Sequence, residues 1–393
     1  MGQKREKNKK KIYIKKAAAL LFVCMVAVIC LVNLIHRDKE FSDKENRMLE
    51  QKPSFTLSGV ASGRFMKQYE SYKSDQFAGR NLWVSLKTNM DLLMGKRDSN
   101  GVFKGKDSYL LEDIKKPKKD QLEENIAAIK EFEESYADVP VYFALVPNAA
   151  NVLSDKLPAL ASTENQGKQF ESIKKGLGDK VNWVDLESAL KKHKKEDIYY
   201  HTDHHWTTLG ASYAYAEIAK AMGLDTANGP KWKQYAVSND FNGTLSATSG
   251  YEQGYREPIR IFVPEKGEKT PDVVINYVDE QRKTASLYDS SKLKEKDQYA
   301  MFLGGNYSMI DIKTTAETTN RLLLVKDSYA NCLVPFLTPF YREIIIIDPR
   351  YYYGDIHQVM EENDITSVLF LYNGNTFVED NSISGVLNNN ETE

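Results

Sequence analysis

Short apolar runs alternate with amphipathic stretches over most of the chain after residue 120. The apolar runs lie at 139–146, 181–186, 322–325, 344–347 and 368–371. Residues 120–136 place Leu122, Ile126 and Ile129 on one helical face, and residues 209–222 form a second helical pattern. Short apolar strands separated by helices are typical of a parallel sheet covered on both faces. We therefore predict an α/β fold for this part of the chain.

Two segments depart from this alternation. Residues 225–320 are polar, contain Gly and Lys, and hold only short alternating pieces such as Ile259–Val263, so we predict a β-rich insertion there. Residues 64–97 have helical spacing and follow a polar, extended stretch. We expect residues 36–119 to form a stalk and an N-terminal helical segment, and residues 120–393 to form the main domain.

The N-terminus carries a basic flank and a long apolar run. Ala17–Ile35 has 19 residues with one polar member, Asn33, and residues 1–16 contain eight Lys or Arg and one Glu. Such a run spans the hydrocarbon core as a helix, and the basic flank stays in the cytoplasm. We predict a cytoplasmic tail at 1–16, a transmembrane anchor at 17–35, and an extracytoplasmic body in the cell envelope. A cleaved signal peptide is the alternative, although no small-x-small cleavage site follows the run.

Charge and cysteine content narrow the function classes. The net charge is −2, and since residues 1–16 carry +7, the remaining chain carries −9. An acidic body is unlike a nucleic-acid binder, which presents a basic face. Cys24 and Cys30 lie in the apolar run, so Cys332 has no partner for a disulfide within the body. We read Cys332 as buried and inert.

A compact group of polar residues lies at Thr202-Asp203-His204-His205-Trp206-Thr207. In a catalytic interpretation, Asp203 orients one imidazole and fixes its tautomer, which makes that imidazole a general base. In a metal interpretation, the group ligates zinc together with His201. In a structural interpretation, Thr202 or Asp203 caps the helix that follows.

A second motif follows an apolar strand at Lys326-Asp327-Ser328-Tyr329-Ala330-Asn331. A Ser at a strand-to-helix turn lies at the carboxyl end of the sheet, where open α/β folds place their sites. The next helix N-terminus would supply N–H groups to a developing oxyanion. Asp327 or Ser328 is alternatively a helix cap only. Taken together, the two motifs contain the nucleophile, base and orienting carboxylate of a serine site.

These residues resemble the DHHW proteins, which are related to the periplasmic alginate O-acetyltransferases. The shared Asp-x-His-Trp-Thr element is matched by residues 203–207, and the nucleophile segment by residues 326–331; the resemblance covers most of residues 40–375. It implies an SGNH-hydrolase-like parallel sheet flanked by helices. Because Asp and His precede Ser, which reverses the usual order, it also implies a circularly permuted version of that fold.

The resemblance implies that Asp203, His205 and Ser328 form the catalytic triad. The chain departs from the pattern at Lys326-Asp327, where SGNH esterases have Gly-Asp, and at His204, where the alginate enzymes need no His. Candidates for oxyanion or substrate contacts are the backbone N–H groups of Ser328 and Tyr329 and the side chains of Asn306, Asn373, Asn375, Arg350 and Trp206. Each Asn is alternatively a turn residue, Arg350 a structural partner of Asp348, and Trp206 a core residue.

We therefore expect an O-acyltransferase, in the first place an O-acetyltransferase, that moves an acyl group through acyl-Ser328 to hydroxyls of an extracellular polysaccharide. We expect neither a cofactor nor a metal. The resemblance implies a membrane-bound O-acyltransferase partner as the donor, since acetyl-CoA is lacking outside the cell. Two alternatives remain open: an extracellular serine esterase or deacetylase with the same triad, and a non-catalytic polysaccharide-binding subunit.

Overall fold

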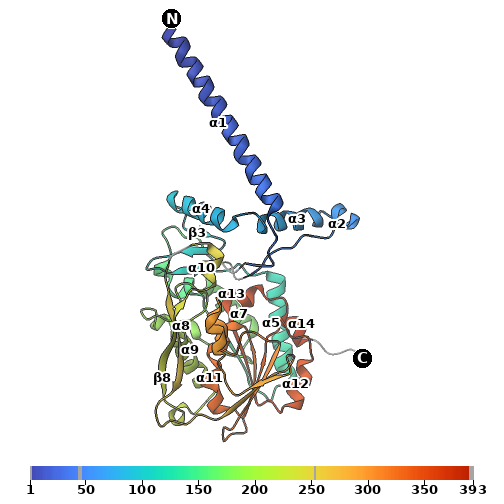
Figure 1. Cartoon of the computed structure of the whole chain (residues 1–393). Coiled ribbons are helices and arrows are strands. Elements are labelled where there is room, and N and C mark those ends of the chain that lie inside the picture. The colour runs from blue at the N-terminus through green and yellow to red at the C-terminus, as the bar shows by residue number, and fades with distance from the viewer. Residues whose placement is uncertain (1, 43–46, 252–253, 389–393) are drawn as a thin grey trace. The chain divides into compact units, whose positions relative to one another are not determined.

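The computed structural model describes residues 2–42, 47–251 and 254–388. It contains two compact units, Met1–Met94 and Gly95–Glu393, and Figure 1 labels most of their helices. The first unit contains the helices α1 (Gly2–Ile35), α2 (Leu57–Ala61), α3 (Arg64–Asp75) and α4 (Arg80–Leu93), and the short pair β1 (Phe41–Ser42) and β2 (Arg47–Met48). Within α1, Lys11–Ile35 is long and apolar enough to cross a membrane. A signal sequence near an N-terminus meets the same criteria of length and composition.

The second unit is built on a mixed sheet of eight strands in the order β11-β10-β12-β14-β13-β15-β6-β7. The strands are β6 (Val141–Val146), β7 (Asn182–Val184), β10 (Val273–Tyr277), β11 (Arg282–Thr284), β12 (Met309–Thr314), β13 (Arg321–Lys326), β14 (Glu343–Ile347) and β15 (Ser367–Asn373). The run from β14 to β7 is parallel, and the run from β11 to β14 is antiparallel. The predicted apolar strands are thus the parallel half of this sheet.

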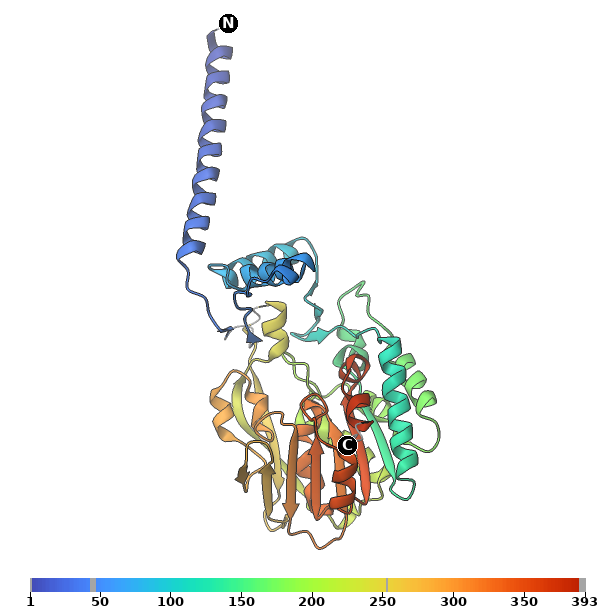
Figure 2. The same cartoon turned by 90° about the vertical axis from the view of Figure 1, so that its right-hand side faces the viewer.

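Helices cover both faces of the sheet, as the two views in Figures 1 and 2 show. One face packs against α5 (Lys119–Ser135), α7 (Gln166–Leu177), α12 (Ile356–Glu362), α13 (Gly374–Glu379) and α14 (Ile383–Leu387), and the other against α8 (Leu186–Lys192), α9 (Thr208–Ala221) and α11 (Val334–Leu337). Along β13, Leu322 and Leu324 point to one core and Leu323 and Val325 to the other. A strand buried on both sides needs apolar residues at every position, which explains the continuous runs.

The segment 225–320 differs in part from the predicted insertion. Its strands β8 (Trp232–Phe241) and β9 (Glu257–Pro264) form a hairpin of their own, with α10 (Thr244–Ser249) between them. The strands β10, β11 and β12, however, extend the main sheet beyond β14. Their alternating burial, with Ile275 and Tyr277 inward and Val274 outward, made them look like an independent polar region in the sequence.

A small sheet of β3 (Asp98–Ser99), β4 (Val102–Lys104) and β5 (Leu110–Glu112) completes the second unit. Asn100 and Gly101 form its first turn with positive φ values of 50° and 73°, which suits these two residue types. The Leu110 N–H donates to the His201 carbonyl at 2.7 Å. This bond holds β5, and with it Glu112, beside the loop that carries the Asp-His motif.

Candidate active site

Ser328 lies at the carboxyl end of β13, in a tight turn that Asp327 organises. The Asp327 carboxylate accepts the Tyr329 N–H at 3.0 Å and the Asn373 N–H at 2.9 Å, so it connects the turn to the end of β15. Asp327 and Tyr329 are buried while Ser328 is half-buried. The turn therefore presents the serine hydroxyl while its neighbours anchor it.

The element after Ser328 differs from the expected helix. It is a 3₁₀ turn, η5 (Ser328–Cys332), followed by the four-residue α11. Pro335 at the start of α11 and Pro339 just beyond it favour short turns over one continuous helix. A macrodipole contribution to an oxyanion, as expected for a longer helix, is therefore not available here. Asp327 does cap the turn, as the structural interpretation held, and this leaves the Ser328 hydroxyl for another partner.

Asp203, His205 and Ser328 form one hydrogen-bonded chain. His205 Nδ1 lies 2.6 Å from Asp203 Oδ1, and His205 Nε2 lies 2.8 Å from Ser328 Oγ. Asp203 is 1% exposed and His205 is 5% exposed. The loop before α9 thus meets the turn after β13 across 123 residues of sequence. The cap of α9 is Thr207, so neither Thr202 nor Asp203 has the capping role.

The contacts of Asp203 fix its charge and the tautomer of His205. Its carboxylate accepts the His205 and Thr244 N–H groups at 3.0 and 2.8 Å and the Thr244 hydroxyl at 2.9 Å. Burial opposes ionisation of Asp203, but the His204 and His205 imidazoles and these hydrogen bonds outweigh it and lower its pKa. An ionised carboxylate only accepts, so His205 Nδ1 donates to it. His205 Nε2 is then the free base that faces the Ser328 hydroxyl.

Gly243 permits the close contact between the loop before α10 and Asp203. A Cβ at this position would lie 2.2 Å from the Asp203 Cβ and 2.5 Å from its Oδ2. The Gly243 N–H donates to the Thr202 hydroxyl at 2.9 Å. Thr202 in turn donates to Glu257, which also accepts the His201 and Thr202 N–H groups. The side chain of Thr202 therefore links the Asp-His motif to Gly243 and Glu257 through hydrogen bonds.

The imidazole of His205 lies between two other rings. His204 lies 3.9 Å from it and Tyr299 lies 3.8 Å from it, centroid to centroid, with Tyr299 stacked at 9°. The Tyr299 hydroxyl also donates to the Ser328 carbonyl at 3.2 Å. Tyr299 therefore positions both base and nucleophile. Nothing in its local sequence indicates this, because the contact arises only when the 3₁₀ turn η4 (Gln298–Met301) packs on the motif.

His204 has a defined tautomer as well. The Thr244 hydroxyl gives its one hydrogen to Asp203, so it accepts from His204 Nδ1, which lies 2.8 Å away. Burial and the nearby His205 lower the pKa of His204, and Asp203 opposes this. His204 is therefore a neutral ring with the proton on Nδ1, and its Nε2 carries a free lone pair.

The four residues of the metal interpretation are not arranged as a zinc site requires. Ligating atoms of Asp203, His204 and His205 lie within 4.8 Å of one another. His201 lies apart from them, because its ring stacks on Tyr109 at 3.7 Å and its Nδ1 donates to the Asp107 carbonyl. The Nδ1 atoms of His204 and His205 are already engaged in the bonds that orient the triad. The arrangement therefore suits proton transfer better than metal ligation.

The candidate oxyanion donors separate into two groups. The Tyr329 N–H is engaged by Asp327, which removes it from the candidates. Among the described residues no acceptor bonds the Ser328 N–H, which leaves it for an oxyanion. The Asn306 Oδ1 accepts from Lys326 Nζ at 3.2 Å and from Asn331 Nδ2 at 3.1 Å, and among the described residues no acceptor bonds its amide N–H₂ group.

The remaining candidates have structural contacts. Asn373 caps α13 and Asn375 bonds the Asp113 and Lys115 backbone, so both amides are turn partners. Trp206 is fully buried and donates to the Tyr329 carbonyl at 2.9 Å, so it supports the nucleophile turn and does not face a ligand. Arg350 forms two hydrogen bonds to Asp348, of 2.8 and 2.6 Å, yet remains half-buried at the surface of the site.

A buried charge network lies below the nucleophile turn. Lys326 and Asp348 are both 0% exposed and their charged atoms lie 3.6 Å apart. Burial lowers the pKa of Lys326, while Asp348 opposes this. The pKa of Arg350 is raised despite its burial, because it is paired with the same carboxylate. Asp348 therefore joins the ends of β13 and β14 beneath the site.

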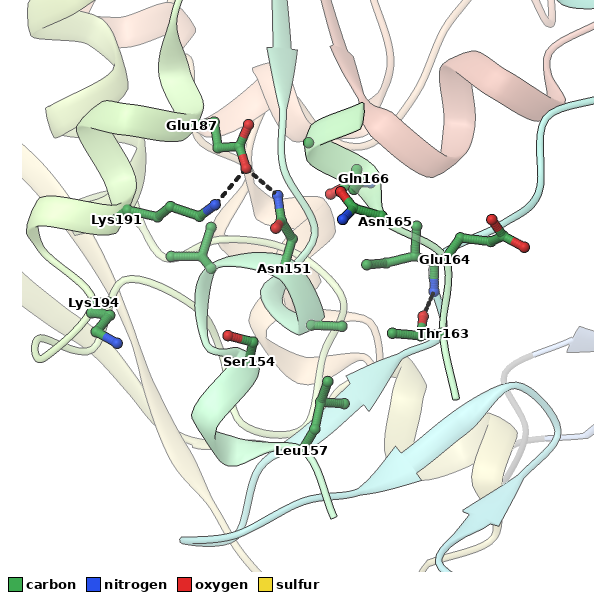
Figure 3. A pocket seen from close by; sticks show the side chains of 14 residues that line it. Asn151, Ser154, Leu157, Thr163, Glu164, Asn165, Gln166, Glu187, Lys191 and Lys194 are labelled. Carbon is green, nitrogen blue, oxygen red and sulfur yellow. Dashed lines mark hydrogen bonds and ion pairs between the residues drawn. The ribbon is translucent and has the colours of Figure 1, made fainter. Parts of the chain in front are cut away.

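Two cavities lie near the carboxyl edge of the parallel strands. One, of about 320 Å³, is lined in part by His204, Arg350, Asn373 and Asn375 and so adjoins the triad. The other, of about 490 Å³, is shown in Figure 3; a triad residue lines neither cavity, and only the first is lined by His204, which neighbours His205. In the second cavity Glu187 pairs with Lys191 and accepts from Asn151, so these polar groups bond one another.

Cys332 is buried, and burial raises the pKa of its thiol to about 12.

Comparisons with known proteins identify the fold and the family of the chain. Residues 102–309 match the family model of the SGNH hydrolase-like domain of acetyltransferase AlgX. That segment includes Asp203 and His205, and Ser328 follows it. No curated protein gives a significant match.

Solved structures with a similar fold include a DHHW family protein from Eubacterium siraeum, with 24% identity and a TM-score of 0.62 over 73% of this chain and 95% of that one. PatB1 from Bacillus cereus has 26% identity and a TM-score of 0.57, over 70% of this chain and 96% of its own. A second PatB1 structure, with a sulfonyl adduct, has 25% identity and a TM-score of 0.57, over 71% and 95%. The second unit therefore has the predicted SGNH-like α/β fold; the circular permutation stays a prediction. The chain belongs to the family of SGNH hydrolase-like acetyltransferases that includes AlgX.

Proposed function

We propose that this protein is an extracytoplasmic O-acetyltransferase that carries the acetyl group on Ser328 and passes it to a hydroxyl of an extracellular polysaccharide. The observation that carries the proposal is the hydrogen-bonded chain from Asp203 through His205 to Ser328. Its distances suit a serine nucleophile with a base and an orienting carboxylate. Membership of an acetyltransferase family supports an acetyl group as the one transferred.

The first half-reaction forms the acyl-enzyme. Ser328 Oγ attacks the donor carbonyl carbon while His205 Nε2 takes the hydroxyl proton, and Asp203 stabilises the resulting imidazolium. The Ser328 N–H and the Asn306 amide are the candidate donors to the oxyanion. The tetrahedral intermediate collapses, its bond to the donor oxygen breaks, and His205 returns the proton to that oxygen.

The second half-reaction transfers the acetyl group. An acceptor hydroxyl attacks acetyl-Ser328 and gives its proton to His205 Nε2. When this intermediate collapses, Ser328 Oγ leaves and recovers the proton, so the enzyme ends as it began. Water in place of the acceptor would give hydrolysis, which is the esterase alternative.

The N-terminal helix supports a location for this chemistry at the membrane. The apolar stretch Lys11–Ile35 and the basic residues before it support a single-pass anchor with a cytoplasmic N-terminus. We expect the anchor to hold the enzyme beside a membrane-bound O-acyltransferase that supplies acetyl groups from the cytoplasm. The acceptor would then be a polysaccharide of the cell envelope.

Turnover of an activated acetyl ester by the full-length chain in detergent tests this function. We expect p-nitrophenyl acetate to give acetylated oligosaccharide in the presence of a glycan acceptor, and no product with Ser328→Ala. Free acetate as the sole product with every glycan would identify an esterase. Ester turnover that is equal in wild type and Ser328→Ala would contradict the proposal and favour a non-catalytic subunit.

A further inference from the structure

The cavity of about 320 Å³ beside the triad has an acidic lining. Three of its side chains, Glu112, Glu379 and Asp380, are carboxylates, and its one cation among the described lining residues is Arg350. The Arg350 side chain is itself paired with Asp348, with which it forms two hydrogen bonds, so three carboxylates face one cation that is already paired. The cavity therefore presents net negative charge to whatever enters it.

Asp380 is a buried carboxylate in the wall of this cavity. It is 6% exposed, and its Oδ1 accepts the Ser382 and Ile383 N–H groups at 2.7 and 3.0 Å. Its Oδ2 has no hydrogen-bond partner among the described residues, although it is buried. Because this oxygen is covered by protein, Asp380 acts on the cavity through its negative charge and not through a hydrogen bond to a ligand.

His204 connects the cavity to the reacting atoms. Its ring lines the cavity and lies 3.9 Å from the ring of His205. With Nδ1 bonded to Thr244, its remaining polar atom is the unprotonated Nε2, which accepts hydrogen bonds. A hydroxyl bound to this nitrogen lies next to the base that must deprotonate it.

Glu112 also lines this cavity. One of its carboxylate oxygens accepts from Asn148 Nδ2 at 2.9 Å, which fixes the side chain. Glu379, by contrast, is an exposed residue at the end of α13. The two carboxylates thus line the same cavity as the His204 ring, so a negatively charged sugar there is repelled.

We propose that this cavity is the acceptor site, that His204 Nε2 accepts the hydrogen bond of the hydroxyl to be acetylated, and that the site selects sugar units that are uncharged or carry an ammonium group. The inference rests on the proposed function and specifies its substrate class. The acceptor proton still passes to His205, so His204 is a positioning residue. Polyuronates are disfavoured acceptors.

Acceptor competition with the full-length chain in detergent tests the charge selection. The donor is p-nitrophenyl acetate, and the acceptors are length-matched oligomers of glucosamine, glucose and galacturonate. The readout is base-labile O-acetyl product relative to free acetate. We expect glucosamine or glucose oligomers to exceed galacturonate by about ten-fold or more at low ionic strength, with a smaller gap at high salt.

The double variant Glu112→Gln with Glu379→Gln tests the cause. Gln at 112 still accepts from Asn148, so the contact is kept while both charges are lost. We expect transfer to galacturonate to rise at least about three-fold relative to glucose. Glu361→Gln, an exposed residue on α12 outside this cavity, is the matched control and should leave the preference unchanged.

His204→Asn tests the hydroxyl site. The Asn amide reproduces the Nδ1 donor to Thr244 but lacks Nε2, so the ratio of transfer to hydrolysis should fall with every acceptor. His204→Gln, which places a polar group near Nε2, should recover part of that ratio.

The outcomes separate the two proposals. If acetyl-Ser328 never forms, the proposed function fails and the acceptor site fails with it. If acetyl-Ser328 forms and is hydrolysed, but galacturonate accepts as well as glucose or no glycan accepts, the acceptor proposal alone is overturned.

Discussion

At the scale of single residues, the site depends on contacts that sequence spacing does not reveal. Asp203, His205 and Ser328 could be named because their residue types occur in two recognisable motifs. Thr244, Tyr299 and Glu257 could not, since each is an ordinary residue until the chain folds. Gly243 could not be named either, because it contributes by lacking a Cβ that would clash with Asp203.

Gly243→Ala should disrupt the triad while leaving most of the fold intact. Gly243 has a φ of −80°, so alanine is tolerated by the backbone, but its Cβ would lie 2.2 Å from the Asp203 Cβ. Asp203 must then move, and misplacement of about 1 Å costs on the order of 10²-fold in rate. The measurement is ester turnover. Gly385→Ala, where no atom lies within 4 Å, is the control and should be near wild type; equal activities in both variants would contradict this account.

Glu257→Gln should remove a pH dependence of stability. Burial raises the pKa of Glu257 to about 7 from 4.5, against the hydrogen bonds from Thr202 and His201. The folded chain then binds one more proton than the unfolded chain between these values, so stability is lost as pH rises from about 4.5 to about 7. We expect the free energy of unfolding to fall by about 2 to 3 kcal/mol more in wild type than in the variant between pH 5 and pH 8. Denaturant titrations at both pH values measure this; parallel pH profiles would show that Glu257 is ionised throughout.

At the scale of elements, the parallel strands were predictable and their neighbours were not. The strands β13, β14 and β15 are apolar at successive positions because helices cover both of their faces. The strands β10 to β12 alternate in burial, so they read as a separate polar segment although they extend the same sheet. The turn after Ser328 also looked helical, but Asp327 and the two prolines shorten it. The local apolar pattern predicts the strand ends at which the site lies. The place of β10 to β12 in the sheet and the short turn after Ser328 depend on tertiary contacts, which the pattern does not contain.

The stability of the fold should depend on the charge of Asp348, which joins the ends of β13 and β14. This carboxylate is 0% exposed and faces both Lys326 and Arg350, so Asp348→Asn leaves two cations without their counter-charge. Removing one partner of a buried pair costs about 3–5 kcal/mol, and we expect that loss in the free energy of unfolding. Asp364→Asn removes an exposed partner of Arg321 and should cost less than about 1 kcal/mol. Similar losses in both variants would contradict the proposed role of the network.

At the scale of the whole molecule, the proposed function combines a membrane anchor with an extracytoplasmic enzyme. The basic flank and the apolar run predict this organisation from composition alone, because both signals are local. The unit that follows residue 95 contains every residue of the proposed site. Charge also matters at this scale, because both the chain after residue 16 and the cavity beside the triad are acidic.

The anchor should be retained in the mature protein. We expect the full-length chain to stay in the membrane fraction after a carbonate wash, and mass spectrometry to detect tryptic peptides from residues before Ala17. A chain without residues 1–36, secreted through a cleavable signal, should be soluble. A mature N-terminus located after Ile35 would show that the helix is a cleaved signal peptide.

The central claim is that Ser328 is a nucleophile activated by His205 and Asp203, and covalent labelling tests it most directly. Sulfonyl fluorides react with activated serine hydroxyls and release fluoride, so phenylmethylsulfonyl fluoride is a suitable probe. We expect the intact mass of the full-length chain to show one adduct, mapped to Ser328 and absent from Ser328→Ala. Labelling should slow by about 10²-fold or more in His205→Ala and Asp203→Asn, but not in His193→Ala, which alters an exposed pair with Glu196. An adduct on another residue, or equal rates in wild type and His205→Ala, would contradict the account.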